Sequence, residues 1–252
     1  FTSATDAFNV AVGNNAGAAV TTGTSNTLIG GLAGDALTTG DDNIVLGYNA
    51  LGSNTGSNRN IAIGVSALLN FNVSSDSNTY NVAVGHAAGG AMTTGIQNIL
   101  IGGFAGDAIT DADGNVAMGH SSLSSNTVGS YSTAIGYRAL NNQNPASATD
   151  MYNTAVGTDA GTSITTGTEN TIVGGLALDA GTTSSFNTAV GVQALTTNIL
   201  SNANVAIGNN ALATHNIASS GAGYNVAVGF NAGLSVTTGT QNTFVGAQAG
   251  DG

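Results

Sequence analysis

Four aspartates recur at one constant interval along the chain, and this is the pattern in the sequence that comes nearest to a metal site. They are Asp35, Asp107, Asp179 and Asp251. Carboxylate oxygens suit Ca²⁺, and three copies of such a residue could ring the axis of a trimer. Ca²⁺ usually takes about six to eight oxygen ligands, however, so one carboxylate per repeat needs help from carbonyls or water. A Ca²⁺-loaded roll is therefore an alternative, and solvated turn residues are the interpretation we favour.

The residues that could perform catalysis do not form a recurring set. His86, His120 and His215 stand at different places in the repeat, which predicts histidines at the surface or rim. Cysteine is absent, and no combination of serine, histidine and acid recurs, so the sequence predicts no enzyme and no cofactor. The glycine-rich stretches are not phosphate loops, because no lysine follows them.

Two other polar patterns are candidates for a functional surface. Threonines recur at 21–24, 93–95, 165–168 and 237–240. An ice-binding face needs an uninterrupted array over many repeats, and neighbouring repeats break this one, so an ice-binding solenoid is a minor alternative. The clusters Asp41-Asp42 and Asp111-Ala112-Asp113 are interpreted as solvated turn residues that do not recur at equivalent places.

The positions of all these residues follow from one short motif, Asn-x-x-x-Gly, which occurs fourteen times along the chain. Successive motif glycines lie at one constant interval, except that every fourth interval, such as that from Gly64 to Gly85, is longer by four residues. Three short coils and one long coil thus make a four-coil block. Such a fixed period is typical of a solenoid, in which each unit buries its apolar side by stacking on its neighbours. The motif glycines are Gly13, Gly30, Gly47, Gly64, Gly85, Gly102, Gly119, Gly136, Gly157, Gly174, Gly191, Gly208, Gly229 and Gly246.

Asparagine begins thirteen of the fourteen motifs, and Ser132 is the exception. Stacked asparagines about 4.8 Å apart can form a ladder of hydrogen-bonded amides, so a structural role is favoured over a glycan-binding row. They are Asn9, Asn26, Asn43, Asn60, Asn81, Asn98, Asn115, Asn153, Asn170, Asn187, Asn204, Asn225 and Asn242.

The residues between the asparagine and the glycine predict a short strand. The third residue after the asparagine is always aliphatic, so we expect it to form a buried row, with the mostly alanine second position facing the other way. The glycine predicts a positive φ or a tight bend. Seven residues after the asparagine, thirteen coils carry alanine, and we expect this Ala and Gly face to pack against identical copies in a homotrimer.

Composition excludes several kinds of partner. Charged residues make up 6% of the 252 residues, and the formal net charge is −11. Such a balance argues against binding to nucleic acid and to an anionic membrane surface. No apolar run approaches the roughly 18 residues of a membrane span, so we expect no membrane insertion.

The long coils insert four residues, in loops that end in an aromatic side chain. Function in solenoids is often placed in such loops, but the similarity of the closing aromatics favours a packing role over ligand contact. These residues are Tyr80, Tyr152 and Tyr224, with Phe8 in the equivalent place.

The sequences at 9–17, 81–89 and 225–233, all Asn-Val-Ala-Val-Gly-x-x-Ala-Gly, resemble the head repeats of trimeric autotransporter adhesins of the YadA type. So does Thr-Ala-Ile-Gly-Tyr-Arg-Ala-Leu at 133–140. They are also similar to repeat arrays of phage tail fibres that end in an endosialidase-type chaperone. The resemblance implies a left-handed parallel β-roll, trimeric and extracellular, on a cell surface or a virion fibre.

The sequence as a whole predicts an all-β parallel β-solenoid of fourteen coils, continuous over residues 1–252. We expect it to be a window of a longer array. The expected role is a non-enzymatic, rigid trimeric shaft or adhesive surface whose partner is itself, in a homotrimer or a longer filament. A module that binds a host-surface glycan or protein is the alternative.

Overall fold

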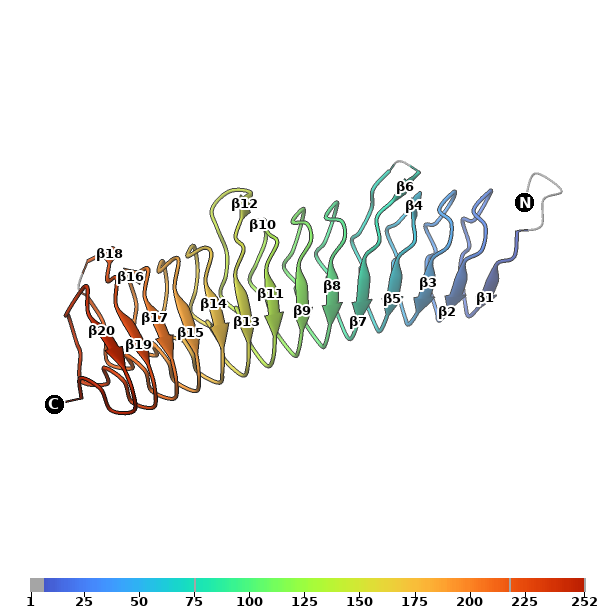
Figure 1. The fold of residues 1–252 in the computed structure, drawn as a ribbon. Helices are drawn as coiled ribbons and strands as arrows, with labels where there is room; N and C mark the ends of the chain where they lie inside the picture. Colours follow the sequence, from blue (N-terminus) through green and yellow to red (C-terminus); the bar gives the residue numbers. More distant parts are fainter. Residues whose placement is uncertain (1–6, 75, 218, 252) are drawn as a thin grey trace. The chain divides into compact units, whose positions relative to one another are not determined.

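The computed structural model describes residues 7–74, 76–217 and 219–251, and it confirms the predicted β-solenoid. The described residues form strands and turns and no helix (Figure 1). The strands of the main sheet have three residues each, one per coil, and are parallel. Their bounds are β1 Val10–Val12, β2 Thr27–Ile29, β3 Ile44–Leu46, β5 Ile61–Ile63, β7 Val82–Val84, β8 Ile99–Ile101, β9 Val116–Met118, β11 Thr133–Ile135, β13 Thr154–Val156, β14 Thr171–Val173, β15 Thr188–Val190, β17 Val205–Ile207, β19 Val226–Val228 and β20 Thr243–Val245.

Two-residue strands form short parallel pairs beside the main sheet, each pair joining a third coil to the long loop of the fourth. β4 Ser57–Asn58 pairs with β6 Ser77–Asn78, β10 Gly129–Ser130 with β12 Thr149–Asp150, and β16 Ser201–Asn202 with β18 Gly221–Ala222. The long loops therefore continue the stacking, because their inserted residues add backbone pairing.

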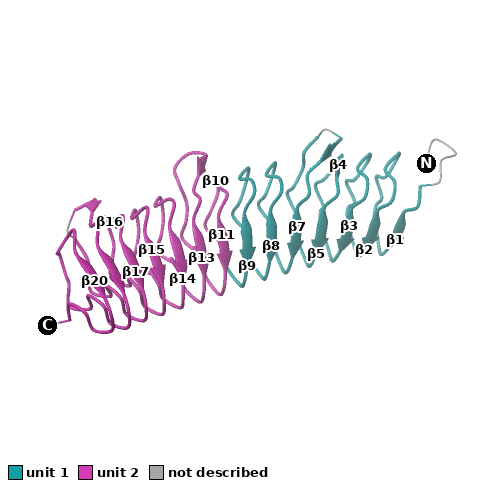
Figure 2. Cartoon of the chain, in the orientation of Figure 1, with its two compact units in different colours: residues 1–121 teal, residues 122–252 magenta. Residues whose placement is uncertain are grey.

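The chain divides into two compact units, Phe1–Ser121 and Ser122–Gly252 (Figure 2). The main-sheet strands lie side by side in chain order: β1-β2-β3-β5-β7-β8-β9 in unit 1 and β11-β13-β14-β15-β17-β19-β20 in unit 2. Each residue of a strand pairs with its equivalent in the next coil, as Thr27 does with Ile44. The repeat in the sequence is thus the register of the sheet. The predictions of one continuous solenoid, of left-handedness and of a trimer stay predictions.

The motif glycines have the positive φ that the sequence predicts. At Gly30 φ is +133°, and a Cβ built there would lie 2.5 Å from the carbonyl oxygen of Gly47 in the next coil. A side chain would therefore both strain the backbone and separate the coils.

Three other corners of each coil are left-handed although most of them carry side chains, which the sequence did not reveal. In one coil Asp42, Asn49 and Leu51 have φ of +58°, +56° and +51°. Such conformations are uncommon outside glycine. They turn the chain sharply enough to close so short a coil.

The predicted inner and outer faces of the strand are wrong, because they are exchanged. The second residue after the asparagine points inward: Val45, Ala62 and Leu100 are all 0% exposed. The aliphatic third residue points outward, and Leu46 is 44% exposed. The asparagine fixes this parity, since its amide is bonded inside the coil and side chains alternate along a strand.

The predicted alanine face for trimer packing is also wrong. Ala50, Ala67 and Ala88, seven residues after their asparagines, are 0% exposed within one chain. They line the core together with leucines such as Leu51 and Leu68. Small residues are needed there because opposite walls of each narrow coil meet at close range.

Candidate functional site

The motif asparagines form a ladder inside each unit. In unit 1 the Asn26 Oδ1 atom accepts hydrogen bonds from the backbone N–H of Asn43 at 2.9 Å and from its Nδ2 at 3.1 Å. The Asn43 Nδ2 atom also donates to the Ser57 carbonyl across the same coil, at 3.0 Å. Each amide thus ties its coil to the previous one and closes the coil on itself. The asparagines between Asn9 and Asn242 are buried, so they cannot be a ligand-binding row.

Gln143 completes the ladder at the coil in which Ser132 stands in place of the motif asparagine. Gln143, from the loop of the same coil, places its Oε1 atom 3.0 Å from the Asn153 Nδ2 atom and 3.1 Å from the Ser132 hydroxyl. All three side chains are buried. The sequence contains a signal for this contact. A serine in place of a buried asparagine removes an amide oxygen, which another side chain then has to supply.

The outward face of the main sheet is an exposed apolar surface in each unit. Its positions, one and three residues after the motif asparagine, carry only Val, Ile, Leu, Met and Thr in the fourteen strands. Several side chains of this outward face are more than a third exposed: Val10, Val12, Ile44, Leu46, Ile99, Met118, Ile135, Val173, Ile207 and Val245. A flat sheet face without charge suits contact with another apolar surface.

The aromatic residues that end the long loops are largely exposed, and their predicted packing role stays a prediction. Phe8, Tyr80, Tyr152 and Tyr224 are between 48% and 75% exposed, and each occupies a left-handed corner just before its motif asparagine. Tyr131 and Phe186 hold the same corner in short coils. These six side chains, which we call the aromatic row, belong to the coil corner rather than to the long loop.

Neighbouring members of this row interact across coils. The Tyr131 and Tyr152 rings are stacked, 5.8 Å apart at 10°. The Tyr152 hydroxyl donates to Asp150 at 3.1 Å, and this hydrogen bond raises the pKa of Tyr152. In unit 1, Arg59 bonds the Tyr80 hydroxyl at 2.9 Å and lies 3.5 Å from Asp42.

The four regularly spaced aspartates are not brought together. Asp35 and Asp107 follow β2 and β8, which are four coils apart in unit 1, and Asp179 and Asp251 follow β14 and β20, four coils apart in unit 2. Asp179 accepts the Thr196 hydroxyl and Asp251 the Ser235 hydroxyl, while the Asp35 Oδ1 atom is buried without a hydrogen-bond partner. The described residues contain no group of three or more histidine, cysteine or acidic side chains that could hold a metal ion.

Two acidic residues that we interpreted as solvated have structural contacts. Asp41 accepts the Thr24 backbone N–H at 2.6 Å, and Asp113 accepts that of Ile96 at 2.7 Å. Asp41 and Asp113 lie one four-coil block apart, so the expectation that the two acidic clusters do not recur at equivalent places is wrong. Each carboxylate joins its coil to the one before.

The threonine rows are likewise used within the chain. The Thr21 hydroxyl donates to the Thr38 carbonyl of the next coil at 3.1 Å, and the Thr93 hydroxyl donates to the Thr110 carbonyl at 3.1 Å. These hydroxyl protons bond the backbone, which lowers their capacity to organise water.

The histidines differ from one another. His86 and His120 are exposed and flank Phe104, with ring centroids 5.0 Å and 5.8 Å from it. His215 is fully buried, so the expectation of a rim position is wrong for this residue. Its Nε2 atom is 3.1 Å from the Ser201 hydroxyl oxygen, the spacing of a nucleophile and its base. Both side chains are 0% exposed, however, so a substrate could not reach them.

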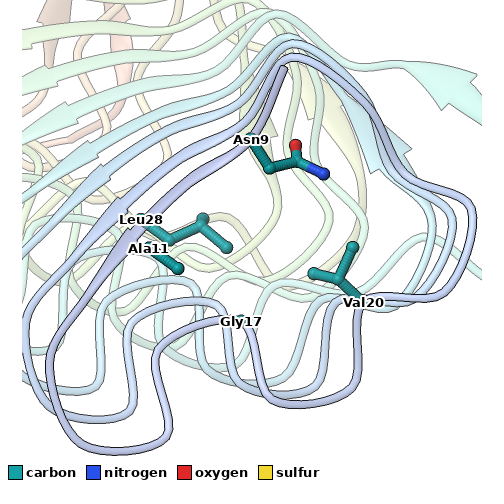
Figure 3. A pocket seen from close by; sticks show the side chains of 5 residues that line it. All are labelled: Asn9, Ala11, Gly17, Val20 and Leu28. Carbon is teal, nitrogen blue, oxygen red and sulfur yellow. The ribbon is translucent and has the colours of Figure 1, made fainter. Parts of the chain in front are cut away.

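A hollow of about 160 Å³ lies at the first described coil of unit 1, where all three residues of β1 are exposed. Its lining consists of Asn9, Ala11, Gly17, Val20 and Leu28, and Figure 3 shows Asn9, Val20 and Leu28 directed into the coil interior. The single polar side chain among them already accepts the Asn26 N–H and donates to the Gly23 carbonyl, each at 2.7 Å. The hollow thus has a mainly apolar lining and offers no group for catalysis.

Comparison with known proteins gives no relative from which a role could be transferred. No protein-family model matches the chain, and no curated protein or solved structure is significantly similar to it. Among the described residues there is no helix with the length and apolar character that crossing a membrane requires.

Proposed function

We propose that the chain is a non-enzymatic structural segment of an extracellular fibre, and that it assembles with copies of itself into a rigid trimeric shaft. The observation that carries the proposal is the outward face of the main sheet. In every strand this face is built from Val, Ile, Leu, Met or Thr, and Ile44 and Leu46 of the interior strand β3 are 45% and 44% exposed.

A second copy of the chain is the occupant that this face fits best. Both surfaces would be uncharged and repeated at the strand spacing of about 4.8 Å, so they can match over successive coils. Burial of such side chains stabilises by about 25 cal/mol per Å² of apolar surface. Closed assemblies of identical chains are the commonest solution for soluble proteins, and the resemblance to trimeric adhesin heads favours three chains.

The buried surfaces of each coil support a shaft rather than an enzyme. Hydrogen bonds of the asparagine ladder, such as Asn43 to Asn26, connect successive coils. The serine and histidine that approach each other, Ser201 and His215, are both inaccessible.

The proposal is tested by the mass of the assembly in solution. Sedimentation velocity of the unaltered chain is expected to give three times the 24.4 kDa of one chain. Leu46→Lys places a charge on the outward face and should yield monomers. Thr39→Lys, at an exposed position outside this face, is the matched control and should leave the trimer intact. A monomeric unaltered chain, or a Leu46→Lys variant that still assembles, contradicts the proposal.

The aromatic row supports a second candidate, a surface that binds host glycans. Exposed aromatic rings offer apolar faces next to polar hydroxyls, a combination suited to sugar rings. Tyr131 and Tyr152 are stacked, and Asp150 lies at hydrogen-bond distance from Tyr152. Glycan-array binding that is lost in Tyr131→Ala and Tyr152→Ala, but kept in Leu46→Lys, would favour this role. Absence of any glycan signal for the unaltered chain would exclude it.

A further inference from the structure

One core position in the fourth coil of each block is filled differently every time. Phe71, Gln143 and His215 stand one block apart from each other, and all three are 0% exposed. The same pocket thus accepts an apolar ring, an amide and an imidazole. Only the imidazole can gain a proton near neutral pH.

The surroundings of His215 fix its neutral form. The Ser201 hydroxyl oxygen accepts a hydrogen bond from the Asn204 Nδ2 atom at 2.9 Å, so its own proton is free to point at His215 Nε2, 3.1 Å away. The Asn225 Nδ2 atom, also a donor, lies 3.4 Å from the same Nε2 atom. The two protons of that amide are donated to the Gly239 carbonyl at 2.8 Å and to the Asn204 Oδ1 atom at 3.3 Å, so the Ser201 hydroxyl is the donor available to a neutral Nε2.

A proton on Nε2 would meet only neutral partners in this pocket. It would face the Asn225 amide, which is itself a donor, and the Ser201 oxygen, which can accept it only if the hydroxyl proton turns away from the ring. The Nδ1 atom is buried and makes no hydrogen bond of good geometry, although the Thr237 backbone lies close enough to the ring to raise its pKa. The groups that face the ring are Ser201, Asn225 and the backbone of Thr237, and none of them is charged.

A buried imidazolium without a counter-ion is costly, so the protonated ring is expected to leave the core. Burial lowers the pKa of His215, and the Thr237 backbone offsets part of this effect. A histidine whose pKa is lower in the folded state stabilises that state fully above its ordinary pKa of about 6.5. This stability is lost progressively as the pH falls below that value.

We propose that His215 is a proton-operated latch that holds residues 213–217 in the core of unit 2 when neutral and releases them when protonated. Other hydrogen bonds of the segment join it to the coils before and after it. The Asn216 N–H donates to the Thr237 carbonyl at 2.7 Å, and the Thr214 hydroxyl donates to the Leu234 carbonyl. The Ala213 carbonyl accepts the Thr197 hydroxyl at 2.8 Å, and the Asn216 Oδ1 atom accepts the Ile199 N–H at 3.4 Å. Release would uncover the asparagine ladder next to Asn204 and Asn225.

Hydrogen exchange at two pH values tests the latch, with exchange corrected for its intrinsic pH dependence. Between pH 7.5 and pH 5.0 the opening equilibrium of residues 213–217 should rise by up to about 30-fold, from the ordinary histidine pKa and proton linkage. The equivalent segments 69–73 and 141–145, which hold Phe71 and Gln143, should keep their protection. Equal changes in all three segments, or none at 213–217, overturn the proposal.

The repeats of the chain supply matched variants. His215→Gln copies the residue of the second block and His215→Phe that of the first, and either should abolish the pH dependence while preserving the coil. A His215→Gln chain that still opens at pH 5.0 contradicts the latch. An NMR titration of the unaltered chain tests the same point without substitution: a His215 midpoint at or above that of a free imidazole also contradicts it.

Discussion

Gln143 accepts a hydrogen bond from the side-chain amide of Asn153 at 3.0 Å and takes the place in the ladder that Ser132 leaves open. The bond joins the long loop of one coil to the asparagine that stands directly before the next strand, β13. An amide oxygen at this point is therefore a structural requirement of the stack, whichever residue supplies it.

Gln143→Ala should lower the free energy of unfolding by about 1 to 3 kcal/mol, because the buried Asn153 amide loses an acceptor. Ser132→Asn in the same chain should restore most of the loss, since it returns the ordinary ladder residue. Urea denaturation followed by circular dichroism measures both. If Ser132→Asn gives no recovery, the two side chains do not share one role.

Gly30→Ala and Gly31→Ala form a matched pair of adjacent substitutions. Gly30 has φ of +133° and a Cβ there would lie 2.5 Å from the Gly47 oxygen, whereas the nearest atom to a Cβ on Gly31 is in the Tyr48 ring, at the ordinary contact distance of 3.4 Å. We expect a loss of about 3 kcal/mol or more for Gly30→Ala and little change for Gly31→Ala. Thermal unfolding of the two variants compares them directly, and equal melting temperatures would refute the argument.

Ala206→Asp and Ile207→Asp test which face of β17 is inside. Ala206 is 0% exposed and Ile207 is 39% exposed. The first substitution buries a charge and should cost several kcal/mol or prevent folding, and the second should retain the far-ultraviolet spectrum of the fold. The reverse order of stability would restore the inner and outer faces that the sequence suggested.

Asp150→Asn should move the pKa of Tyr152 down towards its ordinary value of about 10. The main cause of the raised pKa is the hydrogen bond that the phenol donates to the Asp150 carboxylate. Ultraviolet titration of the phenolate, with Tyr152→Phe to identify its signal, measures the shift. An unchanged midpoint means that the carboxylate does not govern this tyrosine.

Removal of divalent cations should leave thermal unfolding unchanged. Asp35 and Asp107 are separated by four coils, or about 19 Å at the strand spacing, so they cannot share one ion within a unit. A melting temperature that falls with a chelator and recovers only with Ca²⁺ would show a site formed between chains.

The sequence predicts the coil, its register and the need for glycine, because each depends on one period and on backbone sterics. It does not predict which side of the strand is buried. An invariant aliphatic position such as Leu46 and a small one such as Ala62 both fit a core, and the choice depends on where the Asn43 and Asn60 amides point. That direction follows from hydrogen bonds to partners 14 and 17 positions away in the chain.

The features of the candidate site could likewise be predicted from the sequence only in part. The exposure of the aromatic row could not be predicted from the sequence. It depends on left-handed backbone at Tyr80 and Tyr152, and tyrosine is not a residue type that indicates this conformation. The buried His215 could have been anticipated from its alignment with Phe71, because equivalent positions of a solenoid share one environment.

The ladder of hydrogen bonds from coil to coil also determines how each unit would respond to tension. The bonds run along the stacking direction, so a pull on one chain end loads the outermost coil while the coils behind it bear little force. Coils should then peel off singly, and each short coil would release about 50 to 60 Å of chain at roughly 3.3 to 3.6 Å per residue. A single-molecule force record should show regular steps of this length. A shaft built of such units would therefore extend in small steps under load and dissipate mechanical work, rather than unfold in one event.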